Sequence, residues 1–159
     1  MEFSGTHLIA ASREQVWQCL NDGAILKACV PGCESFESVG EDRFDAVVVA
    51  AVGPVKARFK GNLVLSDRDA PNSYRITGQG EGGVAGFGKM TADVTLSAAE
   101  DGGTSLHFVA QAQVGGKLAQ IGARLVTGVA NKMAAEFFTR FTAAVSGTVS
   151  GAVPEIPAQ

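Results

Sequence analysis

Polar and apolar residues alternate along most of the chain, a pattern typical of β-strands with one face in water. The segment 55–63 shows it most clearly, because Lys56, Arg58 and Lys60 are separated by apolar or small residues. Turn-forming residues interrupt the alternation at 39–42, 53–54, 67–72, 82–83 and 100–103. The segment 33–113 therefore predicts about six antiparallel strands, and residues 2–9 predict one more.

Two short helices are predicted between the first strand and the remaining strands. Ser12 and Gln15 have the spacing of a capping box, which predicts that a helix begins there. The cluster at 21–23 interrupts that helix and allows a second one through 24–28. Pro31 and Gly32 end the helical segment.

A long helix is predicted at 117–145, where apolar residues recur every three or four positions. It would measure about 43 Å at 1.5 Å per residue, which is long enough to cover the apolar face of the sheet. We predict an α+β fold in which a curved antiparallel sheet of about seven strands wraps around this helix. Residues 1–145 would form one domain, and the aperiodic residues 146–159 a disordered tail.

Composition and charge restrict the function. Hydrophobic residues make up 46% of the 159 residues, yet no apolar run reaches the roughly 18 residues of a membrane span. A net charge of -3 gives the chain no long-range basic field, which argues against binding to nucleic acid. The N-terminal residues lack the pattern of a secretory signal, so we expect a cytoplasmic location.

Residues with metal-binding or catalytic spacing are absent from the sequence. The cysteines are predicted to be free thiols, because no second Cys or His pair completes a metal site. His7 and His107 each stand alone on a predicted strand, and no nucleophile motif occurs. The glycines at 78–88 lead into a strand rather than a helix, which argues against a phosphate-binding loop. We expect no catalytic residue, no metal and no tightly bound cofactor.

A sheet that curves around a straight helix leaves a wedge of space. Gly78, Gly80, Gly86 and Gly88 would keep this wedge open, which predicts a cavity for an apolar molecule; alternatively, they only allow the strands to bend. The predicted lining is aliphatic and aromatic: Trp17, Phe59, Leu63, Ile76, Phe87, Met90, Phe108, Ile121, Leu125, Val129, Met133 and Phe137. The predicted entrance, which could instead be a set of tight turns, comprises Gly83, Gly86, Phe87, Gly115 and Gly116.

Three segments of this sequence occur together in a characteristic order: Pro31-Gly32-Cys33-Glu34, GQGEGGVAGFGKMTADVTL at 78–96, and QVGGKLAQIGARL at 113–125. They resemble the CoxG family of carbon monoxide dehydrogenase subunits, within the START/birch-pollen-allergen (SRPBCC) superfamily. The resemblance implies a helix-grip fold and a non-catalytic accessory role beside a molybdenum hydroxylase such as carbon monoxide dehydrogenase. It also implies attachment of that enzyme to the inner face of the membrane.

Three functional interpretations follow. An accessory protein with an apolar cavity could carry a quinone or lipid, since electrons from the hydroxylase must reach a membrane quinone. A small cavity enzyme, similar to cyclases or hydrolases, would require inward acid or base groups, for which Glu34, Asp93 and His107 are the candidates. A purely structural adaptor would have a filled core and an exposed apolar patch.

Overall fold

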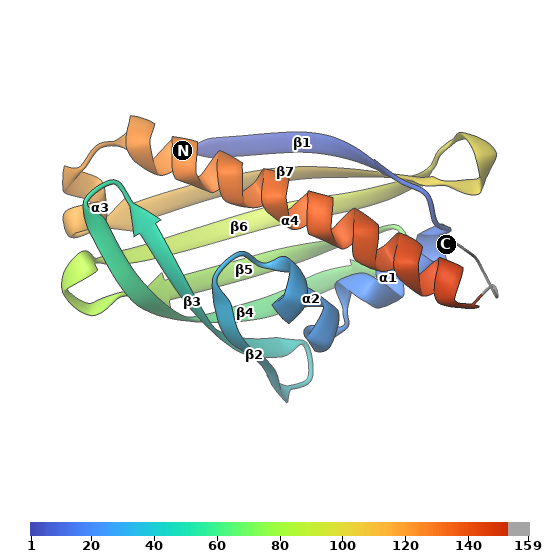
Figure 1. The fold of residues 1–159 in the computed structure, drawn as a ribbon, viewed down its shortest axis with the longest axis horizontal. Coiled ribbons are helices and arrows are strands. Elements are labelled where there is room, and N and C mark those ends of the chain that lie inside the picture. The colour runs from blue at the N-terminus through green and yellow to red at the C-terminus, as the bar shows by residue number, and fades with distance from the viewer. Residues whose placement is uncertain (153–159) are drawn as a thin grey trace.

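The computed structural model describes residues 1–152, and within them the side chains of residues 1–146. A sheet wraps around one long helix that crosses it diagonally (Figure 1). In chain order the elements are β1 (Glu2–Ile9), α1 (Arg13–Leu20), α2 (Gly23–Cys29), β2 (Cys33–Gly40), β3 (Arg43–Val52), β4 (Val55–Asp69), β5 (Ser73–Glu81), η1 (Gly83–Ala85), β6 (Phe87–Ala98), η2 (Glu100–Gly102), β7 (Thr104–Gly115), α3 (Lys117–Gln120) and α4 (Ala123–Ala152).

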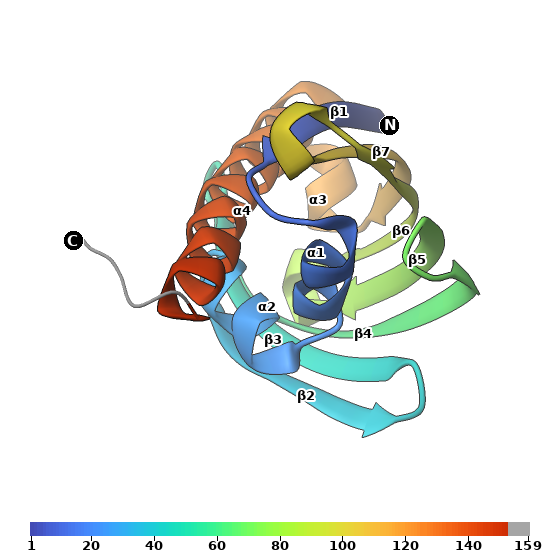
Figure 2. The same ribbon diagram turned by 90° about the vertical axis from the view of Figure 1, so that its right-hand side faces the viewer.

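The sheet has seven strands in the order β1-β7-β6-β5-β4-β3-β2, and every neighbouring pair is antiparallel. Consecutive strands from β2 to β7 are neighbours, while β1 pairs with the last strand. The sheet curves around α4, and α1 and α2 lie across one end (Figure 2). The predicted helix-grip arrangement is therefore confirmed.

The two short helices begin at side-chain caps. Ser12 Oγ accepts a hydrogen bond from the backbone N–H of Gln15 at 3.2 Å, as the capping-box spacing predicts. Asp22 Oδ1 accepts from the backbone N–H groups of Ala24 and Ile25 at 3.0 and 3.3 Å. These caps fix the start of both helices that close one end of the sheet.

The C-terminal helix differs from its prediction at both ends. The structure breaks the predicted single helix after α3, where Gly122 adopts a φ of +104°, and α4 begins at Ala123. At the other end α4 continues to Ala152, because the next proline is Pro154 and a glycine weakens a helix by about 1 kcal/mol without ending it. The first part of the predicted tail, up to Ala152, thus continues the helix, and 153–159 lie outside the described residues.

The main core lies where the second half of α4 meets α1, α2 and the sheet. Phe141 and Val145 of α4 are fully buried, together with Val16 of α1, and Leu106 of β7 is 1% exposed. Large side chains fill this end of the molecule. Within the described residues, no helix is both long and apolar enough to cross a membrane.

A candidate ligand cavity

A cavity runs between α4 and the inner face of the sheet, in two lobes. The inner lobe has a volume of about 400 Å³ and the outer lobe about 380 Å³. Both lobes reach Phe36, Leu63, Met90 and Ala130, so they adjoin along this wall. The inner lobe is lined by Phe3, Leu20, Leu26, Val30, Phe36, Phe44, Leu63, Leu65, Tyr74, Ile76, Met90, Ala92, Val94, Leu106, Phe108, Ala110, Ala112, Ala130, Ala134, Phe137 and Phe138.

The inner lobe is chemically uniform. Tyr74 supplies its single polar side-chain group, and every other lining residue is apolar. Burial raises the pKa of Tyr74 well above its ordinary range, so the hydroxyl keeps its proton. A space of this kind favours apolar molecules and disfavours charged ones, because an unpaired charge loses its hydration there.

The outer lobe has a floor without large side chains. Gly61 of β4, Gly80 of β5 and Gly88 of β6 lie directly opposite one another in the strand pairing, and all three line this lobe. Val126 and Ala130 of α4 lie on the same lobe. Of the four glycines that suggested an open wedge, Gly78, Gly80 and Gly88 therefore do line this lobe, whereas Gly86 does not.

Half of the predicted lining residues lie on the cavity wall. They are Phe59 on the outer lobe, Ile76, Phe108 and Phe137 on the inner lobe, and Leu63 and Met90 on both. Trp17, Phe87, Ile121, Leu125, Val129 and Met133 line neither lobe. Trp17 instead packs edge-to-face on Tyr74, with ring centroids 5.3 Å apart.

The helix residues were misplaced because α4 turns a different face to the cavity. Leu125, Val129 and Met133 recur every four residues, and at 3.6 residues per turn each such step drifts about 40° around the helix. They therefore leave the face that Ala130, Ala134 and Phe137 present to the cavity. Leu125 is 41% exposed and rests against Gly53 in the turn between β3 and β4. Sequence reasoning favoured the larger side chains, whereas a helix that borders a cavity needs small ones.

Several wall residues were missed from the sequence, notably Phe3, Phe36 and Phe44. Each lies on a strand, and the alternation of side chains along a strand could have indicated that they point inward. Phe3, for example, alternates with exposed residues along β1 and lines the inner lobe. Phe36 and Phe44 pack together with ring centroids 5.1 Å apart. Their contact brings β2 and β3 together over the inner lobe.

The predicted entrance lies at a closely packed corner of the molecule. A Cβ added to Gly86 would collide with the backbone of Gly115, and one added to Gly115 would collide with the Phe87 ring. A Cβ added to Gly116 would lie 2.8 Å from the Cα of Gly86, whereas one added to Gly83 would meet nothing within 4 Å. None of these residues lines either lobe, and Gly86, Gly115 and Gly116 allow close packing at this corner. The entrance therefore stays a prediction.

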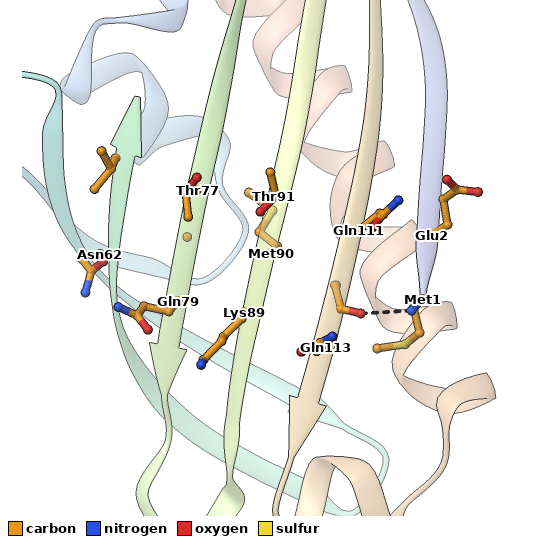
Figure 3. A pocket seen from close by; sticks show the side chains of 13 residues that line it. Met1, Glu2, Asn62, Thr77, Gln79, Lys89, Met90, Thr91, Gln111 and Gln113 are labelled. Carbon is orange, nitrogen blue, oxygen red and sulfur yellow. Dashed lines mark hydrogen bonds between the residues drawn. The ribbon is translucent and has the colours of Figure 1, made fainter. Parts of the chain in front are cut away.

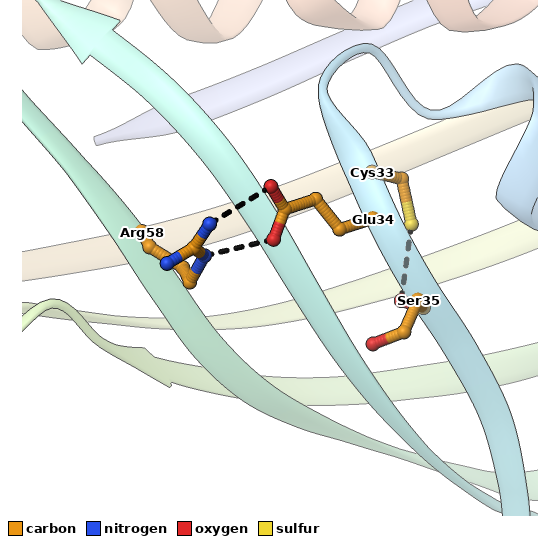
Figure 4. Close-up of polar contacts among 4 residues, drawn as sticks. All are labelled: Cys33, Glu34, Ser35 and Arg58. Carbon is orange, nitrogen blue, oxygen red and sulfur yellow. Dashed lines mark hydrogen bonds and ion pairs between the residues drawn. The ribbon is translucent and has the colours of Figure 1, made fainter.

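The candidate acid and base groups lie on the opposite face of the sheet. Glu34 accepts two hydrogen bonds from Arg58, at 2.8 and 3.1 Å, which lowers the pKa of the carboxyl group (Figure 4). Asp93 is paired with Arg75 at 2.8 Å, and His107 Nδ1 shares a 2.9 Å hydrogen bond with Thr6 Oγ1. Glu34, Asp93 and His107 are all exposed. Among the described residues, the cavity lacks the arrangement that an acid–base enzyme requires.

The cysteines occupy structural positions. Cys19 and Cys29 are buried, and Cys33 donates a hydrogen bond from Sγ to the carbonyl oxygen of Ser35 at 3.2 Å (Figure 4). Burial raises the pKa of each thiol, which disfavours the reactive thiolate. In the part of the chain that the structure describes, no cluster of His, Cys, Asp and Glu could hold a metal.

A second hollow of about 740 Å³ lies on the outer face of the sheet, away from α4 (Figure 3). Its side chains are mostly exposed amides and hydroxyls, including Thr77, Gln79 and Gln111, together with Lys89. At its edge the Met1 amino group donates a hydrogen bond to the carbonyl oxygen of Ala112 at 3.0 Å. This hollow is open and lined mainly by polar side chains, so the internal cavity is the stronger candidate for an apolar ligand.

Solved structures share the fold. A conserved protein from Geobacillus kaustophilus is 31% identical, with a TM-score of 0.87 over 93% of this chain and 97% of that chain. A START superfamily protein from Mycobacterium smegmatis is 12% identical, with a TM-score of 0.69 over 92% of this chain and 98% of that chain. The ZhuI aromatase/cyclase from Streptomyces sp. R1128 is 13% identical, with a TM-score of 0.71 over 96% of this chain and 98% of that chain.

At these low identities, the START protein and the cyclase show the fold alone. No curated protein matches the chain. The model of the carbon monoxide dehydrogenase subunit family CoxG matches residues 5–146, nearly the whole described domain. The chain belongs to the CoxG family of carbon monoxide dehydrogenase subunits.

Proposed function

We propose that this protein carries an apolar molecule, such as an isoprenoid quinone or another lipid, in the internal cavity. The observation that carries the proposal is the inner lobe, about 400 Å³ of space with an apolar wall and one hydroxyl group. Burying about 300 Å² of ligand surface would contribute roughly 7 kcal/mol at 25 cal/mol per Å². Association costs of about 4 kcal/mol leave about 3 kcal/mol from this area alone, which corresponds to an affinity in the millimolar range.

Membership in the CoxG family supports a non-catalytic accessory role. The partner we propose is a molybdenum hydroxylase of the carbon monoxide dehydrogenase type. Its oxidation reaction releases electrons that must reach a quinone, and a carrier with an apolar cavity could take that quinone out of the bilayer. This role needs no acid or base beside the ligand, in agreement with the positions of Glu34, Asp93 and His107 on the outer face.

We further propose peripheral contact with the membrane through the loop between β5 and β6. Val84 is 85% exposed there and Phe87 is 44% exposed. Lys89 follows Phe87 on the same strand, and Lys60 lies exposed on β4, opposite Glu81. Exposed apolar side chains near lysines suit the interface of an anionic membrane.

The carrier role can be tested by extraction. The purified protein is mixed with phosphatidylcholine vesicles that contain ubiquinone, the vesicles are removed by centrifugation, and quinone is measured in the supernatant. We expect quinone to remain with the protein in a molar ratio approaching one. Supernatants with no more quinone than a vesicle-only sample would contradict the proposal.

A further inference from the structure

Tyr74 has a buried hydroxyl group without a partner in the protein. The residue is 4% exposed and lines the inner lobe. No hydrogen bond joins its hydroxyl to another described residue. Arg68, whose charge acts on this hydroxyl, is already paired with Asp42 at 2.7 Å. Buried tyrosine hydroxyls normally have a partner, so this one is available to a ligand.

The hydroxyl also keeps access to open space. Asn21 Oδ1 is the one buried side-chain oxygen or nitrogen, among the described residues, that is sealed from open space and unpaired. The unpaired Tyr74 oxygen is therefore not sealed, and the inner lobe is the apolar space that this residue lines. Because the rest of that wall is apolar, one donor there can fix the position of one acceptor on a ligand.

At the other end of the cavity, two strand glycines have no steric reason to be glycine. A Cβ added to Gly80 would meet no protein atom nearer than 3.7 Å, and one added to Gly88 none nearer than 3.8 Å. Neither residue has a positive φ. Glycine weakens a strand, and an unexplained one often marks a place where a ligand approaches the backbone. Gly61, by contrast, is held to glycine by the carbonyl oxygen of Gln79 at 2.8 Å.

These two features lie far apart on one strand. Gly80 follows Tyr74 by six residues along β5, which corresponds to about 20 Å. The adjoining inner and outer lobes lie between them, and Ala130 of α4 borders both lobes. A molecule that used both features would be long and slim, with its polar atom at the end closed by α1 and α2.

We propose that the cavity holds a long-chain carbonyl compound whose oxygen accepts a hydrogen bond from the Tyr74 hydroxyl and whose chain lies over Gly80 and Gly88. The head group therefore lies at the end closed by α1 and α2, and the chain extends toward the glycine floor. This inference rests on the proposed apolar carrier and adds the orientation and the chemical class of its ligand.

The test uses two probes that differ by one oxygen atom, 2-tridecanone and tridecane. Trp17 is the single tryptophan and touches the Tyr74 ring, so its fluorescence reports binding at the inner lobe. We expect Tyr74→Phe to weaken 2-tridecanone about fivefold to tenfold, the value of one hydrogen bond, and to leave tridecane unchanged. The melting temperature of this variant should stay equal or rise, because its lost hydroxyl was unpaired.

Gly80→Ala and Gly88→Ala test the floor separately. Each should keep or raise the melting temperature and weaken both probes about fivefold or more, because the added methyl group occupies ligand space. Gly128→Ala is the matched control: Gly128 is exposed on α4 with nothing within 4 Å of an added Cβ, so both affinities should stay unchanged.

The outcomes separate this inference from the function on which it rests. If the wild-type protein binds neither probe, both the carrier function and the inference fail. If it binds both, and Tyr74→Phe weakens them equally or not at all, the orientation is wrong while the carrier stands. A fall in melting temperature for Gly80→Ala and Gly88→Ala would show that the fold itself requires these glycines, which would also overturn the inference.

Discussion

His7 of β1 stacks on Phe138 of α4, with ring centroids 4.0 Å apart and ring planes 16° from parallel. Phe138 also stacks on Phe108 of β7, at 5.5 Å. Both phenylalanines line the inner lobe. The three rings thus connect the edge strand, the long helix and the cavity wall, and a histidine is the one titratable member.

Acid should loosen this stack. Burial lowers the pKa of His7 from its ordinary 6.5, so the unfolded chain takes up this proton more readily than the folded one. The stability that His7 contributes is therefore complete above pH 6.5 and decreases as the pH falls toward the lowered folded-state pKa. We expect the melting temperature to decrease over that range and His7→Phe to reduce the decrease. The control His107→Gln, on the outer face, should retain it; equal profiles for His7→Phe and the wild-type protein would contradict this.

Filling the cavity should abolish binding without harming the fold. Ala130 lines both lobes, so Ala130→Phe places a ring where a ligand would lie. We expect quinone uptake from vesicles to fall at least about tenfold while the melting temperature stays equal or rises, as cavity-filling substitutions often allow. Ala135→Phe makes the same change on the exposed face of α4 and should bind like the wild-type protein. Uptake that survives Ala130→Phe would place the ligand elsewhere.

The packed end of α4 should carry much of the stability. Phe141 is fully buried and stacks on Phe137 with ring centroids 5.6 Å apart. We expect Phe141→Ala to lower the free energy of unfolding by about 3–5 kcal/mol, measured by denaturant titration. A loss below about 1 kcal/mol would mean that this end of the helix contributes little to folding.

One exposed loop should contact anionic membranes. Val84→Asp removes an 85% exposed apolar side chain from the loop between β5 and β6. It should lower the fraction of protein that sediments with phosphatidylglycerol vesicles, up to about tenfold if the valine is fully buried in the membrane. Leu8→Asp is the control, because Leu8 is 72% exposed near the end closed by α1. Equal losses for both variants would argue against a specific membrane-facing loop.

The fold was predictable because its signals are local. The alternation of Lys56, Arg58 and Lys60 with apolar or small residues identifies the solvent-exposed face of β4. The Ser12 cap marks the start of α1. Antiparallel order follows from short turns between consecutive strands. Each of these features needs only residues close together in the sequence.

The site was only half predictable because it depends on long-range geometry. Steps of four residues, such as Leu125 to Val129, drift around α4, and only the packing of the helix on the sheet decides which face borders the cavity. The collision between Gly86 and Gly115 depends on the pairing of β6 with β7, so the sequence could not show that these glycines pack closely together. That the Tyr74 hydroxyl lacks a hydrogen-bond partner can be recognised only from the three-dimensional positions of the surrounding side chains.

The most direct test is native mass spectrometry of protein purified from its own host, followed by organic extraction and identification of bound molecules. We expect a quinone or lipid in an amount close to one molecule per chain, and its loss from the Ala130→Phe variant. Protein that carries no such molecule, and that also fails to bind added quinone, would contradict the carrier function and favour a purely structural adaptor.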